Sequence, residues 1–233
     1  MSPWILLYDA TYIFVILGSI VVIMASAYMQ SVYRTYSRIP SQRGLTGDDV
    51  ANMILRYGGV HDVRIQSVAG QLTDHYNPRD KTLNLSQASR QRSSLADLGV
   101  AAHECGHALQ HNQQYFPLQI RNFLVPITNV GAKLSWPIIL VGMLMGFDRN
   151  IMNVGIFLFA IVFIFQLVTL PVEFNASARA IKALESYNVL SPQELNGTRK
   201  VLRAAALTYV ASAAATFLQL FRLILLTNRN NRD

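Results

Sequence analysis

The sequence predicts a mainly α-helical, multi-span membrane helix bundle with a soluble part that contains a small β element. Hydrophobic residues make up 52% of the 233 residues, charged residues only 14%, and the mean hydropathy is +0.27. Soluble domains carry about a quarter charged residues, so the composition argues against an ordinary soluble protein and against a disordered one. The net charge of +7 indicates basic cytoplasmic loops rather than a nucleic-acid partner. The single cysteine excludes an intramolecular disulfide and a multi-cysteine metal site.

Four apolar segments are long enough to span a bilayer as helices, at about residues 10–29, 127–147, 151–172 and 204–221. The first segment lacks a preceding Lys or Arg and is followed by Arg34, Arg38 and Arg43, which favours an uncleaved anchor over a signal peptide. The second reaches spanning length because the Lys133 ammonium can extend to the interface.

The distribution of basic residues predicts the orientation of these spans. Residues 31–129 hold ten Lys and Arg and residues 173–203 hold five, whereas the loop at 148–150 holds one. Because basic loops stay in the cytoplasm, we expect both large loops inside and both termini outside. The chain is then a single membrane-embedded domain, whose soluble part comprises residues 31–126 together with 173–203.

Within the soluble part, residues 46–57 have helical periodicity and end at Gly58-Gly59. Alternating residues 63–65 and 71–76 are expected to form a pair of strands around a turn at Ala69-Gly70, and residues 81–85 a third strand. Another helix is expected from Ser94 to about His111.

That last helix carries the sequence His-Glu-Cys-Gly-His at residues 103–107. His103 and His107 lie four residues apart, so both imidazoles share one helix face and can bind a single ion. Glu104 lies beside that face and can take a proton from a metal-bound water without being a ligand. This is the HExxH arrangement of zinc peptidases, and it predicts one zinc ion. The alternative is a helix whose histidines simply face a polar interface.

A zinc site of this kind requires a third protein ligand. A straight helix separates the Cα atoms of His103 and His111 by about 12 Å, so His111 cannot share the ion. Glu173 stands just past the third span, on the predicted cytoplasmic side, and is the expected ligand; the alternative is an acid at the membrane boundary. Glu185 and Glu194 are interpreted as solvated helix residues, with Glu194 completing a helix-capping signature.

Several segments together resemble the neutral zinc metallopeptidases of bacterial membranes, the YugP-like family. They are residues 103–107, 73–78, 170–174 and 204–210. These proteins are similar to gluzincins, so the resemblance implies a zincin-like catalytic part in a bacterial inner membrane and a peptidase activity. Gluzincins also place a carboxylate four residues after the ligand Glu to bond a zinc-binding His. This chain has Ser177 there, and its nearest polar neighbour is Asn175.

The predicted function is therefore hydrolysis of peptide bonds in a peptide or protein substrate, including membrane proteins that approach along the cytoplasmic face of the bilayer. Zinc would lower the pKa of its water towards about 7, and Glu104 would accept the proton and pass it to the leaving nitrogen. The alternative is an inactive zinc-binding scaffold or chaperone on the same fold. A transporter is disfavoured, because the predicted spans contain no acidic residue apart from Asp9 and Glu173 near their ends. No pattern in the sequence indicates the substrate or the oligomeric state.

Three further residues are candidates for contacts with the substrate or the transition state. His75 or Tyr76 could bond the carbonyl oxyanion from an edge strand, although a simpler interpretation has Asp74 capping the Asn-Pro turn and Tyr76 packing beneath it. Arg179 could steady a transition state, or face water or phospholipid. Cys105 points away from the histidine face and is expected to be a small packed residue.

Overall fold

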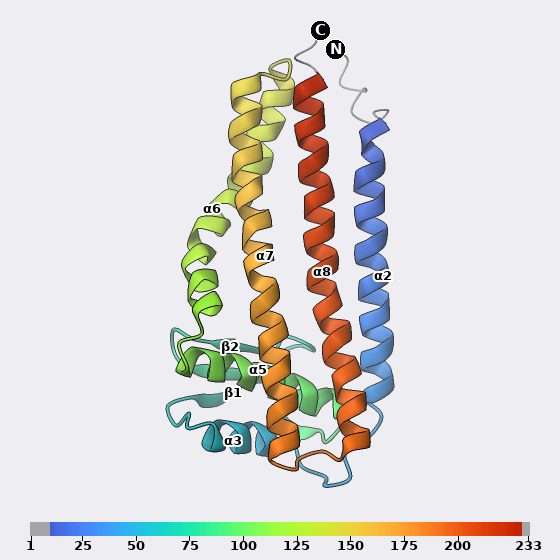
Figure 1. Ribbon diagram of the computed structural model, residues 1–233, viewed down its shortest axis with the longest axis vertical. Coiled ribbons are helices and arrows are strands. Elements are labelled where there is room, and N and C mark those ends of the chain that lie inside the picture. Colours follow the sequence, from blue (N-terminus) through green and yellow to red (C-terminus); the bar gives the residue numbers. More distant parts are fainter. Residues whose placement is uncertain (1–9, 230–233) are drawn as a thin grey trace. The chain divides into compact units, whose positions relative to one another are not determined.

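The structure is a computed structural model that describes residues 10–229. Its elements, in chain order, are η1 (Ala10–Tyr12), α2 (Ile13–Tyr36), α3 (Gly47–Tyr57), β1 (Arg64–Val68), β2 (His75–Asn77), β3 (Thr82–Ser86), α4 (Gln87–Gln91), α5 (Leu95–Asn112), α6 (Phe116–Leu144), α7 (Arg149–Ser186) and α8 (Pro192–Arg229) (Figure 1). The mainly helical fold with a small β element is confirmed. The two chain ends, predicted to lie outside the cell, fall beyond the described residues.

Within residues 10–229, four helices are long and apolar enough to cross a membrane, as the sequence predicts. They are Ala10–Tyr36, Phe116–Leu144, Arg149–Ser186 and Pro192–Asn228. The last two have 38 and 37 residues, more than the 20 or so that a bilayer requires. Each therefore continues well beyond the length of a single span.

The chain divides into two compact units, of which the first contains the described residues 10–26, 120–170 and 208–229. Its buried cluster consists of Ile139, Met152, Phe159 and Leu223. Many of its other apolar side chains are exposed, including Met24 at 66% and Leu144 at 74%. Exposed apolar patches of this extent are typical of a surface that contacts lipid or protein rather than water.

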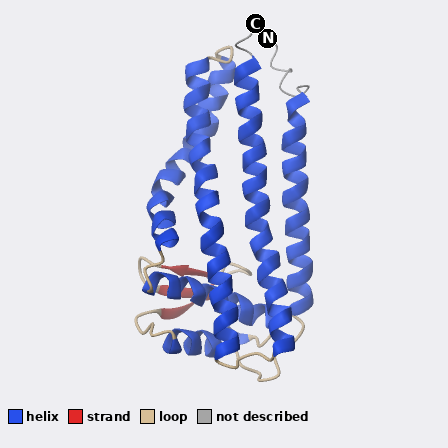
Figure 2. Ribbon diagram, in the orientation of Figure 1, coloured by secondary structure: helices blue, strands red, loops and turns tan. Residues whose placement is uncertain are grey.

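The second unit contains residues 27–119 and 171–207. It includes a three-stranded sheet in the order β1-β3-β2, whose strands are drawn in red in Figure 2. β3 pairs in parallel with β1 and antiparallel with β2. The expected pairing of residues 71–76 back onto 63–65 is therefore wrong. β3 takes the central position because its Leu83 and Leu85 side chains are completely buried, whereas β1 is mostly exposed.

α5 is the central helix of the second unit, and most of its residues are buried. It begins as predicted, with the Ser94 side chain accepting a hydrogen bond from the Asp97 amide. Two glycines then let the neighbouring helices approach its backbone. A Cβ at Gly99 would lie 2.8 Å from Thr198 Cγ2 on α8, and one at Gly106 would lie 2.5 Å from the Ala176 carbonyl oxygen on α7.

The helix caps of the soluble part follow the sequence, with one correction. Thr46 and Asp49 form a reciprocal capping box at the start of α3. At the start of α8, Glu194 accepts hydrogen bonds from the amides of Ser191 and Gln42, at 2.8 and 2.6 Å. Glu194 is thus a buried residue that joins two segments, and its interpretation as a solvated helix residue is wrong.

Candidate metal centre

His103, His107 and Glu173 form a group that could hold a metal ion, with one ligand atom from each within 4.8 Å of the others. Glu173 Oε2 lies 3.3 Å from His103 Nε2 and 3.6 Å from His107 Nε2. Zinc bonds of about 2.0–2.1 Å in a tetrahedron separate neighbouring ligand atoms by about 3.3–3.4 Å. The spacing between these atoms therefore fits three ligands of one tetrahedral zinc ion.

The close approach of α5 and α7 brings these side chains together. Gly106 lies between the two histidines in sequence and leaves no side chain between its helix and the Ala176 carbonyl of α7. Glu173, one turn before Ala176, consequently meets both imidazoles. Its side chain is almost completely buried, and a buried carboxylate is stable only with a positive partner or a metal.

The outer nitrogen of each histidine has a neutral hydrogen-bond partner. His103 Nδ1 lies 3.1 Å from Ser177 Oγ, and His107 Nδ1 lies 3.0 Å from Gln110 Oε1. When Nε2 faces the ion, Nδ1 carries the proton and donates to these oxygens, which fixes the tautomer and the ring orientation. Ser177, at the position where gluzincins carry a carboxylate, thus takes over its contact with the histidine.

Gln110 is a functional residue that the sequence reasoning missed. It is fully buried, and its Nε2 donates to the Val172 carbonyl at 2.8 Å and to Asn175 Oδ1 at 3.0 Å. Its amide therefore holds His107 and ties α5 to the turn of α7 that carries Glu173. The available signal was its position three residues after His107, on the same side of the helix.

Glu104 lies next to the metal group in a buried position. Its Oε2 accepts a hydrogen bond of 3.0 Å from the backbone amide of Tyr76. Burial raises the pKa of Glu104, although the imidazoles of His103 and His107 oppose that increase. The protein therefore places a carboxylate with a raised pKa beside the predicted zinc site.

The electrostatics of His107 also depend on the acid ligand. Burial by itself would lower the pKa of His107, but the contact with Glu173 and the charge of Glu104 outweigh burial and raise it. A raised pKa means that the two carboxylates stabilise a positive charge on the imidazole of His107. A metal cation bound between these groups would supply that positive charge instead.

The three candidate contact residues have different surroundings in the structure. The His75 side chain is exposed, with Nδ1 2.9 Å from the Thr73 carbonyl oxygen. Tyr76 reaches Glu104 through its backbone, while its phenol lies 2.8 Å from His111 Nδ1 and packs against the core. Burial and nearby carboxylates raise the pKa of Tyr76 to about 12, so its phenol stays protonated.

Arg179 is held at the edge of the polar network behind the metal group. Its Nε donates to Asn175 Oδ1 at 2.7 Å, a second nitrogen donates to Gln113, and the guanidinium lies over the Tyr115 ring. Through Asn175, these contacts connect Arg179 to Gln110. Arg179 therefore belongs to the hydrogen-bond network that orients His107.

The turn beside β2 departs from the expectation. Asp74 Oδ1 accepts from the Ser86 amide at 2.7 Å, at the end of β3. Asn77 itself accepts from the Arg79 amide and stabilises the Asn-Pro turn. The expected capping of that turn by Asp74 is therefore wrong. Cys105 is fully buried, as expected of a packed residue, and burial raises the pKa of its thiol.

Comparison with known proteins assigns the chain to one family. The profile of the family described as "Putative neutral zinc metallopeptidase" matches residues 11–228. The protein described as "Putative membrane protease YugP" of Bacillus subtilis (strain 168) is 40% identical over 205 residues, which cover 88% of this chain and 90% of that protein. No solved protein structure matches the chain.

Proposed function

Because the chain belongs to this family of neutral zinc metallopeptidases, we propose that it hydrolyses peptide bonds at the site formed by residues 103–107 and Glu173. The observation that carries the proposal is the spacing of His103 Nε2, His107 Nε2 and Glu173 Oε2, which fits a single zinc ion. A purely structural zinc site is closed by four protein ligands, whereas a catalytic site has three and keeps one position open. Among the described residues this group offers three ligands.

The reaction divides between the ion and the side chains around it. Zinc, when bound, supplies Lewis acidity that polarises the scissile carbonyl and makes water a better nucleophile. Glu104 is the general base: it takes the proton from the attacking water and later gives it to the leaving nitrogen. Gln110 and Ser177 keep both imidazoles oriented throughout, since each accepts the outer N–H of its histidine.

The free edge of the sheet suits an extended peptide. β2 is an edge strand, and the Tyr76 amide points away from β3 to the carboxylate of Glu104. An extended substrate can add to such an edge through main-chain hydrogen bonds. A peptide bound in this way would pass next to Glu104, so β2 is the proposed guide for the substrate.

The experiment that tests this function compares the parent with Glu104→Gln, purified in detergent and loaded with zinc. We expect equal zinc content and a loss of peptide cleavage of about 10²–10⁴-fold, the range supplied by a general base. Asp62→Asn is the matched control, because it removes an exposed carboxylate that forms an ion pair with Lys81. Cleavage by Glu104→Gln at the parent rate would refute the mechanism. A parent that binds zinc and cleaves none of a broad peptide library would favour the scaffold.

We further propose that the catalytic unit faces the cytoplasm, on the strength of the basic residues in its loops. A cysteine introduced at the exposed Arg79 tests this orientation. The native Cys105 is fully buried and gives little background labelling. In intact cells, we expect Arg79→Cys to resist a membrane-impermeant maleimide and to react after the membrane is opened. Labelling in intact cells would reverse the orientation.

A further inference from the structure

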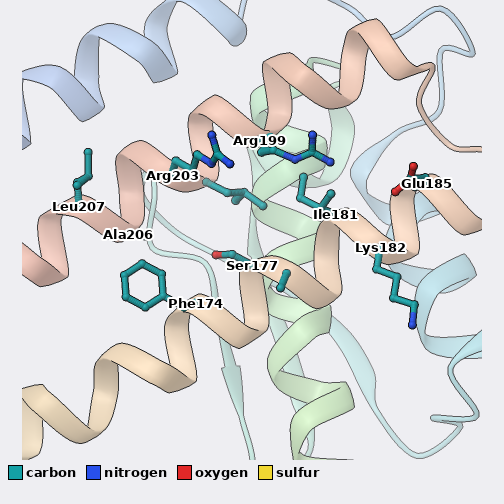
Figure 3. A pocket seen from close by; sticks show the side chains of 11 residues that line it. Phe174, Ser177, Ile181, Lys182, Glu185, Arg199, Arg203, Ala206 and Leu207 are labelled. Atoms are coloured by element: carbon teal, nitrogen blue, oxygen red, sulfur yellow. The ribbon is translucent and has the colours of Figure 1, made fainter.

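A groove of about 570 Å³ lies between the second-unit segments of α7 and α8 (Figure 3). One wall runs from Phe174 to Glu185 on α7, and the other from Arg199 to Leu207 on α8. A volume of this size is typical of a small-molecule site. Of its lining residues, Ser177 alone has a part in the reaction proposed above, through its contact with His103.

The groove changes character along its length. At one end are Phe174, Ala206 and Leu207, which adjoin or belong to the apolar segments 151–172 and 204–221. Phe174 and Leu207 are large apolar side chains that remain 49% and 48% exposed. At the other end are charged side chains, with Arg199 and Glu185 on opposite walls. An occupant that matches this groove has an apolar part directed to the spans and a polar part beyond them.

The charge of the groove selects an anionic head group. Arg199 and Arg203 are four residues apart on α8, so their guanidinium groups lie on one face of the helix and line the same wall. Within residues 10–229, no carboxylate forms an ion pair with either arginine. Lys182 contributes a further cation and Glu185 the only anion of the lining, which leaves two net positive charges. Two arginines on one face match the oxygens of a phosphate.

We propose that this groove binds one anionic phospholipid, with an acyl chain along Phe174, Ala206 and Leu207 and its phosphate at Arg199 and Arg203. The proposal goes beyond the peptidase function and does not depend on it. Arg203 directly precedes the apolar segment that begins at Ala204. If that segment spans the bilayer, Arg203 lies at the level where the head group of a lipid meets its acyl chains.

A substrate peptide fits this groove less well than a lipid does. Ser177 lines the groove and contacts Nδ1 of His103, whereas the predicted zinc ligand is Nε2 on the other side of the ring. The groove therefore lies behind the zinc histidine. A peptide bond placed there would be separated from Glu104 by the imidazole itself.

The test is native mass spectrometry of the full chain, stripped of lipid in detergent and titrated with phosphatidylglycerol or phosphatidylcholine of identical acyl chains. We expect one phosphatidylglycerol to bind at least about tenfold more tightly than phosphatidylcholine, because two arginines near the head group attract its net negative charge. Arg199→Gln with Arg203→Gln should abolish that preference. Arg56→Gln with Arg64→Gln removes the same charge at exposed positions elsewhere in the unit and should preserve it.

A third variant tests the acyl part of the groove. Ala178 is an exposed lining residue of α7, so Ala178→Phe should fill the groove and weaken the binding of both lipids without changing a charge.

Equal binding of the two lipids, or equal loss of preference in both arginine double variants, would overturn the proposal. Phosphatidylglycerol binding that survives in Ala178→Phe would indicate a surface patch instead. A raised KM for peptides in Ala178→Phe, with lipid binding unchanged, would assign the groove to the substrate. Because lipid binding is measured without cleavage, an inactive peptidase leaves the test intact.

Discussion

Replacement of Gln110 by alanine separates the metal-positioning role of this residue from its packing role. In the parent, Gln110 accepts the Nδ1 proton of His107 and donates to the Val172 carbonyl and Asn175. The variant removes the side-chain partner of the largely buried His107 imidazole and of the carbonyl of Val172, which is fully buried. Asn175 loses one hydrogen bond but still accepts another from Arg179, so it contributes less to the destabilisation.

The two consequences differ in size and in the measurement that detects them. The Val172 carbonyl loses its contact with Gln110 whether or not zinc is bound, so that loss lowers the free energy of unfolding by about 0.5–1.5 kcal/mol, the net contribution of one hydrogen bond. The bond from His107 matters more when the imidazole is a ligand, because the ion polarises its N–H. Loss of such an outer partner lowers metal affinity by about 10–100-fold. We therefore expect a folded Gln110→Ala protein whose zinc affinity falls by that factor.

Competition with a chromogenic zinc chelator measures this affinity on detergent-purified protein, with helix content and Tm recorded for each sample. Gln113→Ala is the matched control, because Gln113 directly follows α5 as its C-cap and its side chain contacts Arg179 on α7. We expect the control to bind zinc as the parent does. A folded Gln110→Ala protein with zinc affinity within twofold of the parent would refute the proposed role of Gln110.

Two other substitutions test how α7 completes the site. Ser177→Ala removes the acceptor of the His103 Nδ1 proton, so zinc affinity should fall by about tenfold in the same competition assay; an unchanged affinity would mean that Ser177 does not orient the ring. Gly106→Ala places a methyl group 2.5 Å from the Ala176 carbonyl oxygen, and the strain should lower stability by about 1–3 kcal/mol and weaken zinc binding as the helices separate. Unaltered Tm and zinc affinity in Gly106→Ala would contradict the close approach of α5 and α7.

The sequence predicted the helices well because their signals are local. Spans appear as long apolar runs, and the start of α5 is encoded by Ser94 and its capping partner. The order of the strands was not predictable in the same way. Residues 71–76 follow a turn signal and suggest a local hairpin, but the sheet is arranged by burial of Leu83 and Leu85 in its centre. That burial depends on helices far away in the sequence.

The candidate metal site shows the same division. His103 and His107 identify each other through their spacing on one helix, and Glu173 was found by eliminating other acids and by its place after a span. Gln110 had a weaker signal, because a buried glutamine belongs to no motif and two of its three partners lie on another helix. The role of Ser177 became visible only when the structure placed its hydroxyl against His103.

Neutral hydrogen-bond partners for the two histidines also keep the charge of the site balanced. A zinc ion with Glu173 as its only anionic ligand leaves one positive charge, which ionised Glu104 would balance. The site is largely buried, and a further carboxylate there would be an uncompensated charge with a large desolvation cost. A carboxylate partner also raises the basicity of a ligand imidazole, so it would bind the ion more tightly and make it a weaker Lewis acid. The hydroxyl of Ser177 and the amide of Gln110 carry no charge and would raise the basicity of the rings less than a carboxylate does, so a bound ion would keep more of its Lewis acidity.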